Sequence, residues 1–154
     1  MRLLKPARWL LALVALQSCI IFVGPTDHDD ELRDLVRARA RWNVNGVTDY
    51  DVIARALCFC AFGGTDVRVI IRNGGVVSAT ILATGQMMGG AEAVQYRSVE
   101  QLFDVIENAI DRDAYRIDAT YDLHYGYPSH FFIDYSRNAA DEEFGYEIVQ
   151  FTPR

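Results

Sequence analysis

Basic residues are scarce in this sequence. Its 154 residues include 15 lysines and arginines against 21 aspartates and glutamates, which gives a formal net charge of −6. Arg2, Lys5 and Arg8 lie in a segment that we expect to be removed, and without them the net charge is about −9. A field of this sign repels nucleic acids and anionic lipid headgroups. We therefore expect no nucleic-acid partner.

Motifs of the common enzyme classes are also missing. The sequence has no glycine-rich phosphate-binding loop, no nucleophile elbow and no zincin helix. It has only 4 prolines, and charged residues make up 23% of the chain, a composition that excludes global disorder. Hydrophobic residues make up 51%, enough for the core of one domain. We expect a domain that is not an enzyme and that uses no cofactor.

The N-terminus has the order of a secretory signal peptide. Three basic residues precede an apolar run over residues 9–16, and a Leu-Gln-Ser-Cys sequence then ends at Cys19. That sequence resembles a bacterial lipobox, in which the cysteine thiol receives a diacylglycerol. We predict a signal peptide of the lipoprotein type over residues 1–18, lipidation at Cys19 and a polar tether over residues 19–28.

These features predict a location in the bacterial cell envelope, on a periplasmic or extracellular membrane face, with the membrane bound through the N-terminal lipid. Ordinary secretion and an uncleaved signal anchor are the two alternatives. The apolar run over residues 9–23 is interrupted by Gln17 and Ser18, and it is short for a membrane span.

The rest of the chain, residues 29–154, has the pattern of one α+β domain made of two tandem helix-strand-strand-strand units. The first helix ends at Asn45-Gly46, and its expected apolar face consists of Leu32, Leu35, Val36 and Trp42. The second helix follows a capping box of Ser98 and Gln101. Its apolar stripe consists of Val99, Leu102, Phe103, Ile106 and Ile110.

Short connections between successive strands favour antiparallel pairing. We therefore expect one antiparallel sheet of about six strands, with both helices packed on one face. Residues 84–97, rich in glycine and methionine, are expected to form a surface connection between the two units. The expected strands are residues 50–58, 67–72, 76–82, 115–121, 131–135 and 144–151.

Cys58 and Cys60 are the chemically distinctive pair. An ideal strand holds positions i and i+2 farther apart than the Cβ separation of about 3.8 Å that a disulfide needs, so a bond requires a kink at Phe59. If lipid consumes Cys19, each thiol has only its neighbour as a partner in an oxidising compartment. We predict a structural disulfide, while free thiols and a redox or metal-binding role remain alternatives.

The histidines and the aromatic residues offer weaker candidates. His124 and His130 flank a Gly-Tyr-Pro turn, and we expect surface histidines rather than a metal site. Strand alternation does not place Tyr125, Tyr127 and Phe132 in the core. Exposed aromatic side chains near a turn are typical of protein-contact surfaces. These three residues are our candidate interaction surface.

A set of short motifs is spread over most of the chain: Arg41-Trp42, Gly46, Asp49-Tyr50, Cys58-Phe59-Cys60, Val67-Arg68-Val69, Arg72-Asn73-Gly74, Val77-Ser78, Leu102-Phe103 and Gly126-Tyr127-Pro128. Together these motifs resemble a bacterial envelope lipoprotein family catalogued as domain of unknown function 6174. The resemblance covers residues 32–151 and implies secretion, frequent lipidation and an α+β domain. It assigns no catalytic residues. The helix-plus-meander unit also resembles the PepSY and β-lactamase-inhibitor-protein folds.

Taken together, these features predict a lipid-anchored envelope protein that binds an envelope protein partner or a ligand without catalysis. The alternative is a thiol-disulfide or metal-dependent envelope enzyme that uses Cys58 and Cys60.

Overall fold

A computed structural model describes residues 28–138 and 142–154. The predicted signal peptide, the candidate lipidation site at Cys19 and the tether up to residue 27 lie outside the described residues. Among the residues that are described, no helix has the length and apolar composition to cross a membrane.

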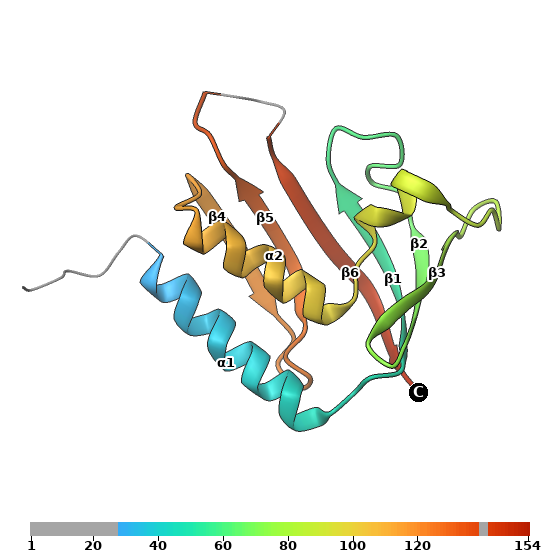
Figure 1. Cartoon of the computed structure of the whole chain (residues 1–154), viewed down its shortest axis with the longest axis horizontal. Helices are drawn as coiled ribbons and strands as arrows, with labels where there is room; N and C mark the ends of the chain where they lie inside the picture. The colour runs from blue at the N-terminus through green and yellow to red at the C-terminus, as the bar shows by residue number, and fades with distance from the viewer. Residues whose placement is uncertain (1–27, 139–141) are drawn as a thin grey trace, which may run out of the picture.

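The two predicted units are present and follow each other along the chain (Figure 1). A short 3-10 helix, η1, lies in the connection that we expected at the surface, although Met88 and Tyr96 of this connection are buried. The elements are α1 (Asp29–Asn45), β1 (Tyr50–Leu57), β2 (Val67–Arg72), β3 (Gly75–Ile81), η1 (Gly90–Gln95), α2 (Val99–Asp111), β4 (Arg116–Tyr121), β5 (Pro128–Asp134) and β6 (Phe144–Pro153).

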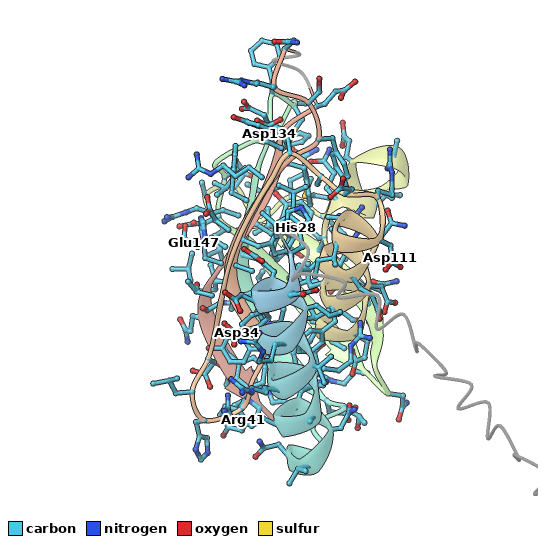
Figure 2. All side chains as sticks on the ribbon, turned by 90° about the vertical axis from the view of Figure 1, so that its left-hand side faces the viewer. His28, Asp34, Arg41, Asp111, Asp134 and Glu147 are labelled. Atoms are coloured by element: carbon cyan, nitrogen blue, oxygen red, sulfur yellow. A yellow bond between two sulfur atoms is a disulfide. The ribbon has the colours of Figure 1, made fainter. Side chains whose placement is uncertain are left out.

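All six strands form one antiparallel sheet in the order β3-β2-β1-β6-β5-β4, which confirms the predicted α+β architecture. The last strand, β6, pairs with β1 along its length and so joins the two units at the centre of the sheet. Figure 2 shows α1 and α2 on the same side of the sheet, with Glu147 pointing to the opposite side. One face is therefore covered by helices, and no described helix covers the other.

Strand β1 shows how alternation builds these two faces. Tyr50, Val52, Ala54 and Ala56 are at most 2% exposed and point toward the helices, while the residues between them are half-buried on the other face. The core that they join includes Leu102, Phe103 and Ile106 of α2, all at most 1% exposed. Burial of apolar side chains on this one face is the main force that holds the helices to the sheet.

The predicted capping box begins α2. Ser98 Oγ accepts a hydrogen bond from the Gln101 amide, and Gln101 Oε1 accepts one from the Ser98 amide at 3.0 Å. The next amide, that of Val99, donates to the Tyr50 hydroxyl at 2.7 Å, so the start of the helix is also tied to β1. Amides that are left free at helix starts thus find partners.

The predicted apolar face of α1 is partly wrong. Leu35 and Trp42 are buried as expected, but Leu32 is 39% and Val36 is 58% exposed, and Ala38 is buried instead. The buried stripe is displaced because the β4–β5 turn packs against the backbone of α1 around Ala38. Facing α2, Arg39 of α1 pairs with Asp104 at 3.0 Å and Glu107 at 2.8 Å.

Candidate interaction site at the disulfide loop

The loop between β1 and β2 contains the predicted disulfide. The sulfur atoms of Cys58 and Cys60 are bonded, and their Cα atoms are 5.3 Å apart. Strand β1 ends at Leu57, so Cys58 is the first residue of the loop and not, as we predicted, the last of the strand. The bond closes where the backbone has left the extended conformation, which removes the geometric obstacle of an ideal strand.

Backbone hydrogen bonds fold this loop back on itself. The amide of Gly63 donates to the Cys60 carbonyl at 3.1 Å, and the amide of Gly64 donates to the Ala56 carbonyl at 2.8 Å. A Cβ atom at Gly63 would lie 2.3 Å from the carbonyl oxygen of Cys58, so only glycine fits there. Phe62 packs against the core from inside the loop. The loop is therefore held by backbone contacts, a half-buried aromatic side chain and the disulfide.

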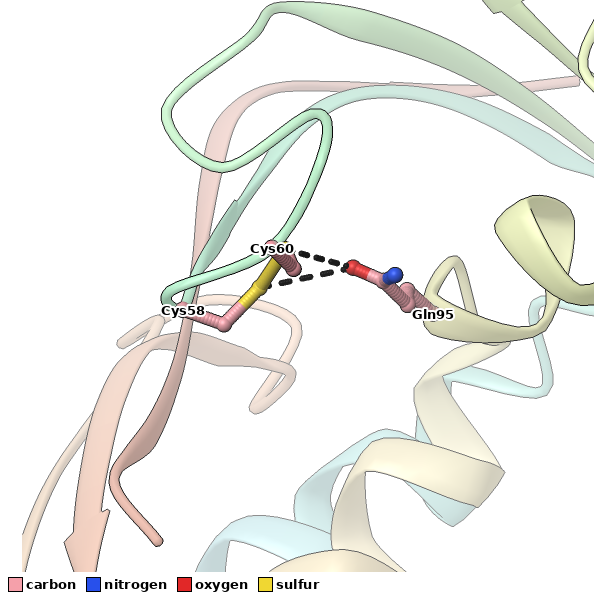
Figure 3. The surroundings of a disulfide bond; sticks show 3 residues. All are labelled: Cys58, Cys60 and Gln95. Atoms are coloured by element: carbon pink, nitrogen blue, oxygen red, sulfur yellow. Dashed lines mark hydrogen bonds between the residues drawn. A yellow bond between two sulfur atoms is a disulfide. The ribbon is translucent and has the colours of Figure 1, made fainter. Parts of the chain in front are cut away.

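Gln95, the last residue of η1, reaches the disulfide from a second segment (Figure 3). Its Oε1 atom lies 3.0 Å from Cys60 Sγ and 3.4 Å from Cys58 Sγ. A disulfide sulfur carries no hydrogen, so in the bonded pair these are packing contacts, whereas a free thiol at either position would donate to this oxygen. The contact brings η1 to the same end of the sheet as the loop.

Phe59 stands between the two cysteines and is 100% exposed. Ala61 is also exposed, and Val94, next to Gln95, is 67% exposed. We call Phe59, Ala61 and Val94 the apolar tip. Residues 58–65 and 83–95, the two segments that carry it, contain a single charged residue, Glu92. An isolated exposed apolar side chain is ordinary, but a group of them with little charge nearby is typical of an interaction site.

The aromatic residues predicted as an interaction surface do not lie together. Tyr125 and Tyr127 are half-buried against Phe151. The ring centroid of Phe151 lies 5.0 Å from that of Tyr125 and 4.6 Å from that of Tyr127. Burial raises the pKa of the Tyr127 hydroxyl above its ordinary value. Phe151 in turn contacts Trp42 of α1 at a centroid distance of 5.9 Å, so this cluster belongs to the helix-covered side.

Phe132 belongs to the other side of the sheet. It alternates along β5 with the buried Phe131 and Ile133, and the guanidinium of Arg116 lies 5.9 Å from its ring centroid. Half-buried and opposite the glycine at position 145, it is separated by the sheet from the two tyrosines. The three residues therefore form no single surface. That any of these residues contacts a partner protein stays a prediction.

The histidines have structural contacts. His28 Nε2 lies 2.7 Å from the Ala114 carbonyl oxygen and so ties the start of α1 to the α2–β4 connection. The His124 ring packs edge-on against Tyr125 in the β4–β5 turn, whereas His130 lies on β5 opposite Thr120. Across residues 28–138 and 142–154, no three histidine, cysteine or acidic side chains come together as metal ligands.

Sequence reasoning found the disulfide but missed the apolar tip. Phe59 was considered only as the site of a kink, and Gln95 was not considered at all. One signal was available, since the two segments that carry the apolar tip are almost free of charge. Their proximity depends on the path of residues 82–95 along the edge of β3, where Met87 bridges Thr80. The sequence pattern does not show such a path.

The fold and the loop define a small α+β domain with one sheet face covered by helices and a disulfide-closed loop at one end. The chain belongs to the family whose model, described as "Family of unknown function (DUF6174)", matches residues 34–153. This match confirms the resemblance to domain of unknown function 6174, whereas the envelope location and the lipid anchor of this chain stay predictions. A search of curated proteins and a search of solved structures found no match.

Proposed function

We propose that this chain is a lipid-anchored protein of the bacterial cell envelope that binds a partner protein without catalysing a reaction. The observation that carries the proposal is the full exposure of Phe59 on a loop closed by a disulfide. The anchor and the binding role rest on different parts of the chain and are argued separately.

Two features support the anchor and the location. The basic residues, the apolar run and the sequence ending in Cys19 stand in the order that lipoprotein signal peptides require. The disulfide supports an oxidising compartment, because such bonds persist outside the reducing cytosol. A module on a lipid and a tether of residues 19–28 is confined near the membrane, which raises its effective concentration toward partners there.

The apolar tip has the properties of a protein contact. An aromatic side chain inserted into a partner's pocket is the commonest kind of energetic anchor in interfaces. Binding costs less when the anchor's backbone is already ordered, and the disulfide, Gly63 and Gln95 order this loop in the free protein. We therefore place the main contact at Phe59, with Ala61 and Val94 beside it.

A photo-crosslinking experiment on the full chain in its native membranes tests both parts. With the crosslinking residue in place of Phe59, we expect one defined protein adduct. Val44, at the end of α1, is the matched control, because it is apolar and 89% exposed but lies outside the tip. Mass spectrometry of the same preparation should show a chain that begins at lipidated Cys19.

The two parts of the proposal fail separately in this experiment. If the adducts formed from position 59 match those from position 44, the apolar tip is not the binding site. An intact Met1, or cleavage at any position other than Cys19, removes the lipid anchor. Tyr127→Ala provides a further comparison. If this variant loses the adduct, the predicted aromatic surface takes part in binding the partner.

A thiol-disulfide enzyme is the second candidate, favoured by a surface hollow of about 320 Å³ at Cys58, Phe59, Cys60 and Ala61. In such an enzyme an external thiolate attacks one sulfur, the S–S bond breaks, and the other sulfur leaves as a thiolate. Gln95 Oε1 would accept a hydrogen bond from that sulfur once it is protonated. This reaction requires a thiol partner that reaches the hollow.

Replacing both Cys58 and Cys60 with serine distinguishes the two candidates. We expect the free energy of unfolding to fall by only about 1–2 kcal/mol, because the disulfide closes a very short loop. The adduct from position 59 should persist in this double variant. Quantitative alkylation of the unmodified chain should label neither cysteine until a reductant is added. Labelling without reductant, together with thiol-exchange turnover that either single serine variant abolishes, would establish the enzyme instead.

A further inference from the structure

The helix-free face of the sheet contains a hollow of about 270 Å³ where β2, β1 and β6 lie side by side. Unlike the apolar tip, this hollow is lined mostly by polar residues. The residues that line it are Asp51, Val52, Ile53, Arg68, Gln150, Thr152 and Arg154.

An irregularity in the sheet lies beside this hollow. The pairing of β1 with β6 shifts between Ile53 and Ala54, which are opposite Gln150 and Ile148, so Val149 has no partner on β1. A β-bulge of this kind bends the strand and changes the direction of the side chains beside it. Bulges are common next to binding sites for the same reason. Gln150 and Thr152 follow the bulge directly and lie in the wall of the hollow.

Asp51 is already matched by two other arginines. Arg72 Nη1 lies 2.9 Å from Asp51 Oδ1, and Arg154 contacts Asp51 Oδ2. The hydrogen bond from Arg154 is the main cause that lowers the pKa of the Asp51 carboxyl, which is therefore ionised at neutral pH. Because these two arginines balance its charge, Asp51 does not need an ion pair with Arg68.

Arg68 nevertheless extends into the same hollow from β2. In the described part of the chain, every other arginine makes an ion pair, a hydrogen bond or a contact with an aromatic ring. Arg68 makes none of these contacts among the described residues and is exposed. Its opposite residue on β1 is Ile53, which offers no charge. The guanidinium is thus free for an anion from outside.

We propose that this hollow binds a singly charged carboxylate, held by the guanidinium of Arg68. The planar guanidinium matches a carboxylate with two parallel hydrogen bonds. Gln150 and Thr152 supply neutral hydrogen-bond donors, and the Ile53 side chain offers apolar contact to the ligand's carbon atoms. Phosphate carries no carbon atoms that could contact Ile53, so we expect it to bind more weakly than a carboxylate with an apolar chain.

The volume of the hollow favours a small ligand or the end of a chain, because pockets for larger ligands exceed about 300 Å³. A single guanidinium–carboxylate contact at a partly open surface supports a dissociation constant in the millimolar range. The inference does not depend on the proposed partner protein, since the hollow and the apolar tip are separate sites.

Amide chemical shifts of the isotope-labelled full chain in detergent micelles provide the test. Titration with butyrate should shift the amides of Arg68, Gln150 and Thr152 in a saturable manner, whereas butyramide, which lacks the charge, should not. A short alanine peptide with a free C-terminal carboxylate, compared with its amidated form, shows whether a chain end binds as well as a free small acid. Inorganic phosphate should bind more weakly than butyrate.

Arg68→Gln should raise the dissociation constant for butyrate by about tenfold or more, the loss expected for one paired charge-assisted contact. Arg37→Gln is the matched control, because among the described residues this exposed arginine of α1 pairs only with Asp34 at 3.7 Å. It should leave the constant unchanged. The proposal is overturned if no carboxylate gives a saturable shift into the tens of millimolar, if Arg68→Gln binds butyrate as the unmodified chain does, or if phosphate binds more tightly.

Discussion

Replacing Gly126 with alanine is expected to lower the free energy of unfolding by about 2–5 kcal/mol. Gly126 has a φ of +89°, a conformation that costs an L-residue about 1–2 kcal/mol. A Cβ atom at this position would also lie 2.4 Å from the carbonyl oxygen of Ala38 and 3.0 Å from the amide nitrogen of Trp42. Relieving an overpacked contact of this kind costs about 1–3 kcal/mol more.

The contact is severe because neither side can move cheaply. Two of the three atoms of α1 that the new Cβ would meet are backbone atoms, and the third is the Cβ atom of Arg41. Shifting the backbone of a helix breaks hydrogen bonds along its axis. On the other side, the turn is closed by hydrogen bonds that Gly126 and Tyr125 donate to Asp122. Packing of Tyr125 and Tyr127 against Phe151 holds the turn in place.

Gly85→Ala is the matched control for the backbone effect. Gly85 has a φ of +70°, but no atom lies within 4 Å of a Cβ built there. Its substitution should therefore show only the conformational cost, about 1–2 kcal/mol. Urea unfolding of both variants, followed by circular dichroism, gives the comparison. If the two variants lose equal stability, the close approach of the turn to α1 is not what requires glycine at position 126.

This contact gives a physical reason for the glycine in one of the motifs on which the sequence resemblance rests. The sequence predicts a turn at Gly126-Tyr127-Pro128 from the turn preference of glycine and proline, and the chain does turn there. It does not show that the glycine is pressed against a helix far away in the sequence. Pro128 is already the first residue of β5 and is buried, so the motif joins a turn to a core position.

The two helices and the strand order within each unit were predictable because their periods of burial are regular. The displaced face of α1 was not, since Leu32 and Val36 have the right spacing for burial but lie on a side that no described element covers. Contacts between distant segments also place Tyr125 and Tyr127 on the opposite side of the sheet from Phe132. Alternation decides the orientation of a residue within a strand, whereas contacts between distant segments decide that of a turn residue.

Of the two candidate sites, one could be predicted from the sequence and the other could not. Pairing of Cys58 with Cys60 was predictable because the two thiols are adjacent in the chain and lack other partners. The absence of a partner for Arg68 within the described part of the chain was not, because it depends on the strand register and on which arginines reach Asp51. A charged residue on a strand gives no sign of its pairing until the register of its neighbours is known.

Replacing Phe103 with alanine is expected to lower the free energy of unfolding by about 3–5 kcal/mol, the usual cost of emptying a fully buried aromatic site. Phe103 is 1% exposed in the middle of α2. Its ring stacks on that of Tyr121 of β4 at a centroid distance of 6.2 Å. The guanidinium of Arg39 lies 5.3 Å from its centroid, so the substitution also removes a contact between the two helices.

Phe59→Ala is the matched control, because it deletes the same atoms from a side chain that is 100% exposed. We expect a change within about 0.5 kcal/mol for this variant, as for other surface positions. Denaturant unfolding of the two variants measures the difference directly. A neutral Phe103→Ala would contradict the packing of α2 on the sheet. A large loss in Phe59→Ala would show that the loop side chain supports the fold, and the apolar tip would then lose its claim as a free contact surface.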